Sequence, residues 1–160
     1  MSQNQLLYIH GLQGTSQGIK AQLLRRDFPD ILVPDFQGDL DTRMAALEAI
    51  LGNQTGWTLI GSSFGGLMAA MFATRRPTQV KRLILLAPAL IWPDFANQPP
   101  PAIDIPTLIY HGRQDQIVPL DLVQELAQQV FTNLEFHAVD DDHGLYETVH
   151  SLDWKGILAG

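Results

Sequence analysis

The chain has 160 residues, the ordinary size of one domain, and 46% of them are hydrophobic, which is enough for a packed core. We therefore expect a single domain over residues 1–160. The net charge of −7 at pH 7 disfavours nucleic-acid binding, which needs clustered Lys and Arg. The sequence has no cysteine, which excludes disulfides, thiolate nucleophiles and Cys-ligated metals.

Neither a targeting segment nor a membrane span is expected. Residues 1–5 are polar and uncharged, and the apolar run after them covers only residues 6–9. The longest apolar stretch, residues 83–92, contains Pro88 and is too short to cross a bilayer. We expect a cytoplasmic protein without a membrane partner.

Short apolar runs alternate along the chain with longer segments of helical period. In chain order the sequence predicts a strand at 6–10, a helix at 17–26 with Ser16 as its N-cap, a strand at 31–33, a helix at 42–51, a strand at 57–60, a buried helix at 64–75, strands at 83–87 and 107–111, a helix at 119–131, a strand at 134–139 and a last helix at 145–158. Most of the apolar runs are continuous, as expected for strands buried on both faces of a parallel sheet. Their alternation with helices predicts crossover units, with helices on both faces of the sheet.

The pattern G-x-S-x-G occurs at residues 61–65, centred on Ser63, between a predicted strand and a predicted helix. A nucleophile on such a tight turn has a strained backbone, and side chains at positions 61 and 65 would collide with the turn. The turn lifts the hydroxyl above the sheet and directs the next helix N-terminus at the substrate. The alternative is a tight turn of small residues, because the bare pattern is common by chance.

A serine nucleophile needs a base, and His143 is the expected one. It follows the last predicted strand, at the sheet edge where ligands bind in open α/β folds. His137 falls inside a predicted strand and His150 in the last predicted helix, so both are less suited. The alternative for His143 is a loop histidine without a role.

The base needs a carboxylate to orient it, and Asp115, after the fifth predicted strand, is the expected one. The chain order Ser63, Asp115, His143 is the Ser–acid–His order of α/β-hydrolases. Asp94 is a rival because it follows the fourth predicted strand, and Asp104 is a weaker one. The alternative for Asp115 is a plain helix N-terminal role.

The negative charge that develops on a substrate oxygen needs hydrogen-bond donors. The backbone N–H groups of Leu12, after the first predicted strand, and Phe64 are the expected pair. A phosphate loop is the rival reading of residues 11–20, but Lys20 is followed by Ala21 rather than Ser or Thr, and the dinucleotide pattern also fails.

Residues 88–106 form a short segment rich in proline after the fourth predicted strand. Such a segment is too short and too stiff for a helical cap, so we expect no lid domain. The expected substrate-binding residues are Gln13, Leu90, Ile91, Trp92 and Leu145. The alternative is that this segment only covers the edge of the sheet, with Trp92 in the core.

On these motifs the chain resembles the α/β-hydrolase superfamily from residue 6 to the C-terminus. Four motifs carry the resemblance, each after a predicted strand: His10-Gly11, Gly61-x-Ser63-x-Gly65, Gly112-x-x-Asp115 and Asp142-His143-Gly144. The short length and the residues around Tyr8–Gly11, Ser16 and Lys20 are similar to small YqiA-type esterases. The resemblance implies a minimal α/β-hydrolase fold with a six-stranded sheet in the order 2-1-3-4-5-6. It also implies a serine mechanism that uses no cofactor and no metal.

We expect hydrolysis of a short-acyl carboxylic ester through an acyl-enzyme. A thioester, a small amide, a perhydrolase reaction or carbon–carbon hydrolysis could use the same residues, because a fold does not choose its substrate. A non-catalytic binding protein on a hydrolase scaffold is the rival from another class. The expected partner is a small acyl ester or thioester, and the sequence leaves the oligomeric state open.

Overall fold

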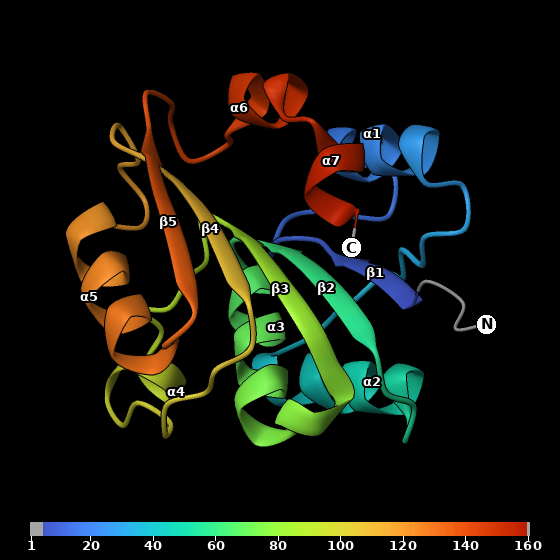
Figure 1. Ribbon diagram of the computed structural model, residues 1–160, viewed down its shortest axis with the longest axis horizontal. Coiled ribbons are helices and arrows are strands. Elements are labelled where there is room, and N and C mark those ends of the chain that lie inside the picture. Colours follow the sequence, from blue (N-terminus) through green and yellow to red (C-terminus); the bar gives the residue numbers. More distant parts are fainter. Residues whose placement is uncertain (1–4, 160) are drawn as a thin grey trace.

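The structure is a computed structural model that describes residues 5–159. Its centre is one sheet of parallel strands in the order β1-β2-β3-β4-β5 (Figure 1). The strands are β1 (Gln5–Ile9), β2 (Trp57–Ser62), β3 (Val80–Leu86), β4 (Thr107–Gly112) and β5 (Leu134–Val139). The expected α/β class and parallel sheet are confirmed.

The expected strand at 31–33 is reduced to one bridge. Leu32 pairs with Leu7 at the free edge of β1. Its carbonyl accepts from the Tyr8 amide at 2.9 Å, and its amide donates to the Leu6 carbonyl at 3.0 Å. Pro34 follows and has no N–H to continue the ladder. The sheet therefore has five strands rather than six, although the bridge lies where the expected order 2-1-3-4-5-6 puts a second strand.

Helices connect the strands. They are α1 (Ile19–Asp27), α2 (Leu40–Leu51), α3 (Phe64–Arg75), α4 (Pro93–Ala96), α5 (Leu120–Val130), α6 (Tyr146–Ser151) and α7 (Trp154–Leu158), with a 3₁₀ turn at Pro77–Gln79. The expected last helix is divided, because Leu152 is extended and the Asp153 side chain accepts a hydrogen bond from the Gly156 amide to begin α7. Ser16 does not cap α1; its amide and hydroxyl instead donate to the Asp35 carboxylate.

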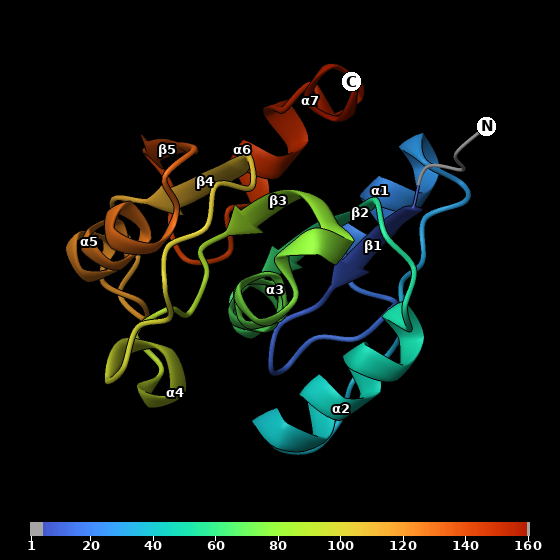
Figure 2. The ribbon, with the colours of Figure 1, turned by 60° about the horizontal axis from the view of Figure 1, so that its bottom comes forward.

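The sheet lies between two helical layers (Figures 1 and 2). Successive strand residues point to opposite faces. Leu7 and Leu59 pack with α2, α3 and α5 in one core, whereas Tyr8 and Ile60 pack with α1, α6 and α7 in the other. Helices on both faces are therefore confirmed, and they bury a parallel sheet whose strands are apolar on both sides.

Helix α3 crosses the centre of the sheet and is buried from Phe64 to Ala73. Its small residues allow close packing against β2 and β3. Because the helix is buried on every side, its sequence is apolar all round. The segment from residue 88 to residue 106 contains only the four-residue α4 as a helix, so it builds no cap domain. Within residues 5–159, no helix has both the length and the apolar character needed to cross a bilayer.

Candidate active site

Ser63 lies on the turn between β2 and α3 with φ 55° and ψ −113°. A positive φ is strained for a residue with a Cβ and persists only where the surroundings hold it. Here the Ser63 amide donates to the Leu86 carbonyl at 2.8 Å, and the Ser63 carbonyl accepts from the amides of Leu67 and Ala89. Hydrogen bonds from both sides thus fix the backbone that carries the hydroxyl.

The two glycines of the turn permit this close packing. A Cβ on Gly61 would overlap the carbonyl of Gly65, and a Cβ on Gly65 would overlap the carbonyl of Ile9. The turn, the start of α3 and the end of β1 therefore meet at backbone contact distance. The steric reason expected for this motif is present in the fold.

His143 bridges Ser63 and Asp115. Its Nε2 lies 2.9 Å from Oγ of Ser63, and its Nδ1 lies 2.7 Å from Oδ2 of Asp115. An ionised carboxylate can only accept a hydrogen bond, so Nδ1 carries the proton of the neutral ring. Nε2 is then the acceptor and faces the serine hydroxyl.

The Asp115 carboxylate is fully buried. Its Oδ1 accepts from the amides of Ile117 and Val118 at 2.9 and 2.8 Å, which leaves Oδ2 for His143. The rivals Asp94 and Asp104 are exposed, and within residues 5–159 neither forms a hydrogen bond to His143. The contact with Asp115 depends on the sharp loop after β4.

That loop is joined directly to the loop that carries His143. The Gln114 amide donates to the Asp141 carbonyl at 3.0 Å, and the Arg113 amide donates to the Val139 carbonyl at 2.8 Å. A Cβ on Gly112 would overlap the Asp141 carbonyl, so these backbones touch. The separation of Asp115 and His143 is therefore set mainly by main-chain contacts.

His111, at the end of β4, is a neighbour of the site that the sequence analysis did not single out. It is fully buried, and its Nε2 donates to the Val118 carbonyl at 2.8 Å and lies 3.2 Å from Oδ2 of Asp115. Burial lowers the pKa of His111 below its ordinary value, which favours the neutral ring. The sequence offered one signal for a role of His111. It directly precedes Gly112, the last residue of the strand whose following loop carries Asp115.

The expected oxyanion donors come from two elements, the loop after β1 and the start of α3. Phe64 is the first residue of α3, so its N–H has no acceptor within the helix. The chain around Leu12 passes beside the turn, since a Cβ on Gly11 would lie 3.5 Å from the Ser62 carbonyl and 3.6 Å from Cβ of Ser63. Within the described chain, neither amide donates to another protein group.

The expected substrate-binding residues fall into two groups. Trp92 is 38% exposed and packs edge-on against the Phe64 ring, with ring centroids 5.0 Å apart. Gln13 is exposed and Ile91 is half-buried. Leu90 and Leu145 are instead fully buried, one in each core, because their side chains point inward from the loops after β3 and β5.

The remaining histidines have other contacts. Nε2 of His10 accepts from the Phe36 amide at 2.9 Å, and His137 stacks on Tyr110. The His150 ring bonds to the Tyr146 carbonyl. No group of three or more His, Cys, Asp or Glu residues that could hold a metal ion occurs in residues 5–159.

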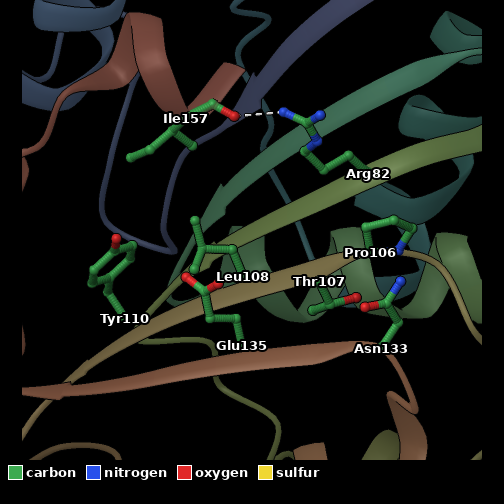
Figure 3. Close-up of a pocket in the computed structure, with 8 residues that line it drawn as sticks. All are labelled: Arg82, Pro106, Thr107, Leu108, Tyr110, Asn133, Glu135 and Ile157. Carbon is green, nitrogen blue, oxygen red and sulfur yellow. Dashed lines mark hydrogen bonds between the residues drawn. The ribbon is translucent and has the colours of Figure 1, made fainter. Parts of the chain in front are cut away.

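A pocket lies on the sheet face toward α7 (Figure 3). Its lining residues are Arg82, Pro106, Thr107, Leu108, Tyr110, Asn133, Glu135 and Ile157. Four of them lie in the first half of β3, β4 or β5, and Pro106 and Asn133 directly precede β4 and β5, whereas Ser63, Asp115 and His143 follow the carboxyl ends of their strands. The pocket is thus separate from the hydrogen-bonded serine, histidine and aspartate.

Comparison with known proteins finds matches to this chain among α/β-hydrolases. Residues 13–102 match the model of a family described as alpha/beta hydrolase fold. Lipase LipV of Mycobacterium tuberculosis (strain ATCC 25618 / H37Rv) is 35% identical over 99 residues, which cover 53% of this chain and 37% of the lipase. The match therefore spans well under half of that relative.

Solved structures extend the likeness over nearly the whole chain. Alpha/beta hydrolase domain-containing protein 10 from mouse has a TM-score of 0.79 at 19% identity, covering 91% of this chain and 84% of its own. A hydrolase of the α/β superfamily from Xanthomonas campestris pv. campestris has a TM-score of 0.78 at 25% identity, covering 94% and 93%. Est1E from Butyrivibrio proteoclasticus with bound ferulic acid has a TM-score of 0.76 at 18% identity, covering 92% and 84%.

Proposed function

The chain belongs to the α/β-hydrolase fold family, and from that premise we propose that it is a serine hydrolase that cleaves short-acyl carboxylic esters. The observation that carries the proposal is the continuous hydrogen-bond chain from Ser63 through His143 to Asp115, at 2.9 and 2.7 Å. This is the arrangement that activates a serine hydroxyl for attack on a carbonyl carbon.

In the first half of the reaction, Oγ of Ser63 attacks the ester carbonyl carbon while Nε2 of His143 takes its proton. The carbonyl oxygen becomes negatively charged and is held by the amides of Leu12 and Phe64. The tetrahedral intermediate collapses as the imidazolium returns the proton to the leaving alcohol. The acyl group then remains on Ser63 as an ester.

In the second half, a water molecule takes the place of the alcohol. His143 removes a proton from this water, whose oxygen attacks the acyl carbon of the Ser63 ester. Collapse of the second intermediate returns the proton to Oγ and releases a carboxylic acid. Asp115 acts throughout by holding Nδ1–H, and so keeps the tautomer in which Nε2 is free to accept.

The relatives support an ester as the substrate class. One matching protein is named a lipase, and one similar structure, Est1E, holds bound ferulic acid, an aromatic carboxylic acid. Trp92 packs against Phe64 and stays partly exposed, and we assign the acyl site to Trp92 together with the exposed Gln13 and the half-buried Ile91, as a shallow surface of mixed polarity. Such a surface suits a small acyl group better than a long one.

Replacement of Ser63 tests the proposal. Ser63→Ala should lower ester turnover by about 10⁶-fold, as loss of a triad nucleophile does. Ser62→Ala is the matched control, because it removes the neighbouring hydroxyl at the end of β2. This variant should keep most of the esterase activity. Equal labelling of both variants by a fluorophosphonate would overturn the assignment.

A substrate panel then separates the acyl classes that share this chemistry. Purified protein is assayed against matched oxygen esters, thioesters and anilides of the same acyl group. We expect the highest kcat/KM for the oxygen ester. A thioester preference would keep the mechanism and change the substrate, whereas an unlabelled, inactive wild-type protein would favour a binding protein.

A further inference from the structure

Arg43, on α2, is a buried cation beside the candidate oxyanion hole. The residue is 5% exposed. Its Nε donates to the Gly38 carbonyl at 2.9 Å and one terminal nitrogen donates to the Leu12 carbonyl at 3.3 Å. The other terminal nitrogen is buried and has no hydrogen-bond partner among residues 5–159.

This charge has no obvious stabilising role. Within the described chain, no carboxylate lies within ion-pair distance of Arg43, as the ion pairs there involve other residues. A buried charge without a counterion costs free energy, and an apolar side chain of similar volume is often as stable or more so. The position therefore points to a role in the site.

The contacts of Arg43 identify that role. The same guanidinium that holds the Leu12 carbonyl lies over the Phe64 ring, 5.3 Å from its centroid. Leu12 and Phe64 come from different elements, after β1 and at the start of α3, and they are the two residues whose amides would hold a substrate oxygen. Leu12 is 44% exposed, so its own side chain does little to fix the loop.

We propose that Arg43 is a positioning residue of the oxyanion hole. It locks Leu12 and Phe64 into one arrangement so that their amides converge on the same point, and its charge adds positive potential where the substrate oxygen becomes negative. This inference rests on the proposed serine mechanism and assigns Arg43 no contact with substrate.

An oxyanion hole acts on the transition state, so its disturbance lowers kcat and leaves KM nearly unchanged. We expect Arg43→Met to lower kcat by about 10²-fold, in the range produced by misplacing or removing one donor. The Tm should stay level or rise, because methionine is apolar and of similar length. Arg43→Lys keeps the charge but lacks the planar fork, so it should lose about 10-fold.

A boronic acid separates positioning from a general structural effect. Phenylboronic acid adds to a nucleophilic serine as a tetrahedral anion, which resembles the transition state. Its inhibition constant should weaken by the same factor as kcat/KM in each Arg43 variant, while KM for the neutral ester stays level. A merely structural role would not make these quantities move together.

Arg82→Met is the matched control. Arg82 also donates from a terminal nitrogen to a backbone carbonyl, that of Ile157, but it lies near the amino end of β3 on the other sheet face (Figure 3). This variant should keep wild-type kcat and boronate affinity. Loss of activity equal to that of Arg43→Met would overturn the inference.

The outcomes also separate the inference from the mechanism on which it rests. If Ser63→Ala abolishes activity but folded Arg43→Met keeps wild-type kcat, only the role of Arg43 is refuted. If the wild-type protein is inactive and unlabelled, the serine mechanism and the inference both fail. If Arg43→Met does not fold, Arg43→Lys decides, since an unchanged kcat there overturns the proposal.

Discussion

The two oxygens of the Asp115 carboxylate have different partners. Oδ1 holds its own loop through the amides of Ile117 and Val118, and Oδ2 faces His143 and His111. Oδ1 therefore stabilises the loop, and Oδ2 orients the imidazole of His143. A substitution that changes only one of these atoms distinguishes the two effects.

Asp115→Asn should lower kcat by about 10⁴-fold and leave the fold intact. The amide oxygen of asparagine can still accept from Ile117 and Val118, so its NH₂ group points at Nδ1 of His143. That group favours the tautomer with the proton on Nε2, which cannot take a proton from Ser63. Steady-state kinetics measure the loss of kcat, and a melting curve shows whether the fold is intact. Asp94→Asn is the control. A larger loss of kcat in that variant would identify Asp94 as the carboxylate that orients His143.

The buried His111 predicts a pH-dependent stability. Its pKa is lowered by burial from the ordinary value of 6.5, which the unfolded chain keeps. Between the folded and unfolded pKa values the unfolded state binds more protons, so the free energy of unfolding falls as pH falls. This contribution is fully present above about pH 6.5 and is lost as the pH drops below it.

Urea unfolding midpoints from pH 8 to pH 5 measure this dependence. His111→Gln places an amide nitrogen near the Val118 carbonyl without a titrating ring, so the slope below pH 6.5 should become shallower. Carboxylates contribute the same background slope to both proteins, which makes the difference between them informative. Parallel curves for the two proteins would show that His111 does not titrate on unfolding.

At the scale of elements, the site depends on how two loops meet. The loop after β4 carries Asp115 and the loop after β5 carries His143, and these strands are adjacent and parallel. Because parallel neighbours end at the same edge of the sheet, their loops emerge side by side. Main-chain contacts between Gly112, Gln114 and Asp141 then determine the spacing.

Gly112→Ala should lower kcat/KM by about 10²-fold, because the added Cβ would push the Asp141 carbonyl away and displace His143 from Asp115. Gly18→Ala is the matched control. Its Cβ would have only ordinary contact, 3.5 Å from the Thr15 carbonyl, and its φ of −67° suits alanine. The comparison needs kcat/KM and melting temperatures for both variants, and equal activity in the two would contradict this account of the spacing.

At the scale of the whole molecule, we expect the segment from residue 88 to residue 106 to limit the size of the site. It provides only the short α4, and Phe95 of that helix is fully buried in the core. Trp92 remains as the exposed aromatic next to Phe64. Long acyl chains would therefore extend into water, where additional methylenes contribute little binding.

We expect kcat/KM to level off at short acyl chains in a series of chromogenic esters with one leaving group. A fully buried methylene contributes about 0.8 kcal/mol, roughly fourfold in kcat/KM, so a deep pocket would give a steep rise. Trp92→Ala should reduce the preference for the favoured chain length. A rate that rises through long chains, or increases sharply above the micelle concentration of the substrate, would indicate a deep or gated site.

The succession of strands and helices could be predicted from the sequence. Helix α3 and strand β5 lie where periodicity places them, and α2 and α5 begin and end within two residues of their predicted bounds. The exceptions are the predicted strand at 31–33, the single last helix and the short α4, which the sequence did not predict. The first two outcomes depend on Pro34 and on the extended Leu152, where a few local interactions outweigh the apolar pattern.

Order along the chain was also enough to bring candidate residues to one edge of the sheet. Ser63, Asp115 and His143 each follow a strand, and parallel strands deliver such residues to the same side. That argument requires only the local pattern and the parallel connection. It cannot supply distances, because each loop conformation depends on main-chain contacts with other loops.

Only the tertiary structure showed the contacts of His111 and Arg43. Arg43 lies 31 residues from Leu12, whose carbonyl it binds. Its helical spacing from Leu47 places it on the buried face of α2, but that spacing does not identify its partners. His111 looks like the end of an apolar strand until the loop after β4 folds back and places Asp115 against it. Periodicity determines which face a residue occupies, but the partner on that face depends on how separate elements pack together.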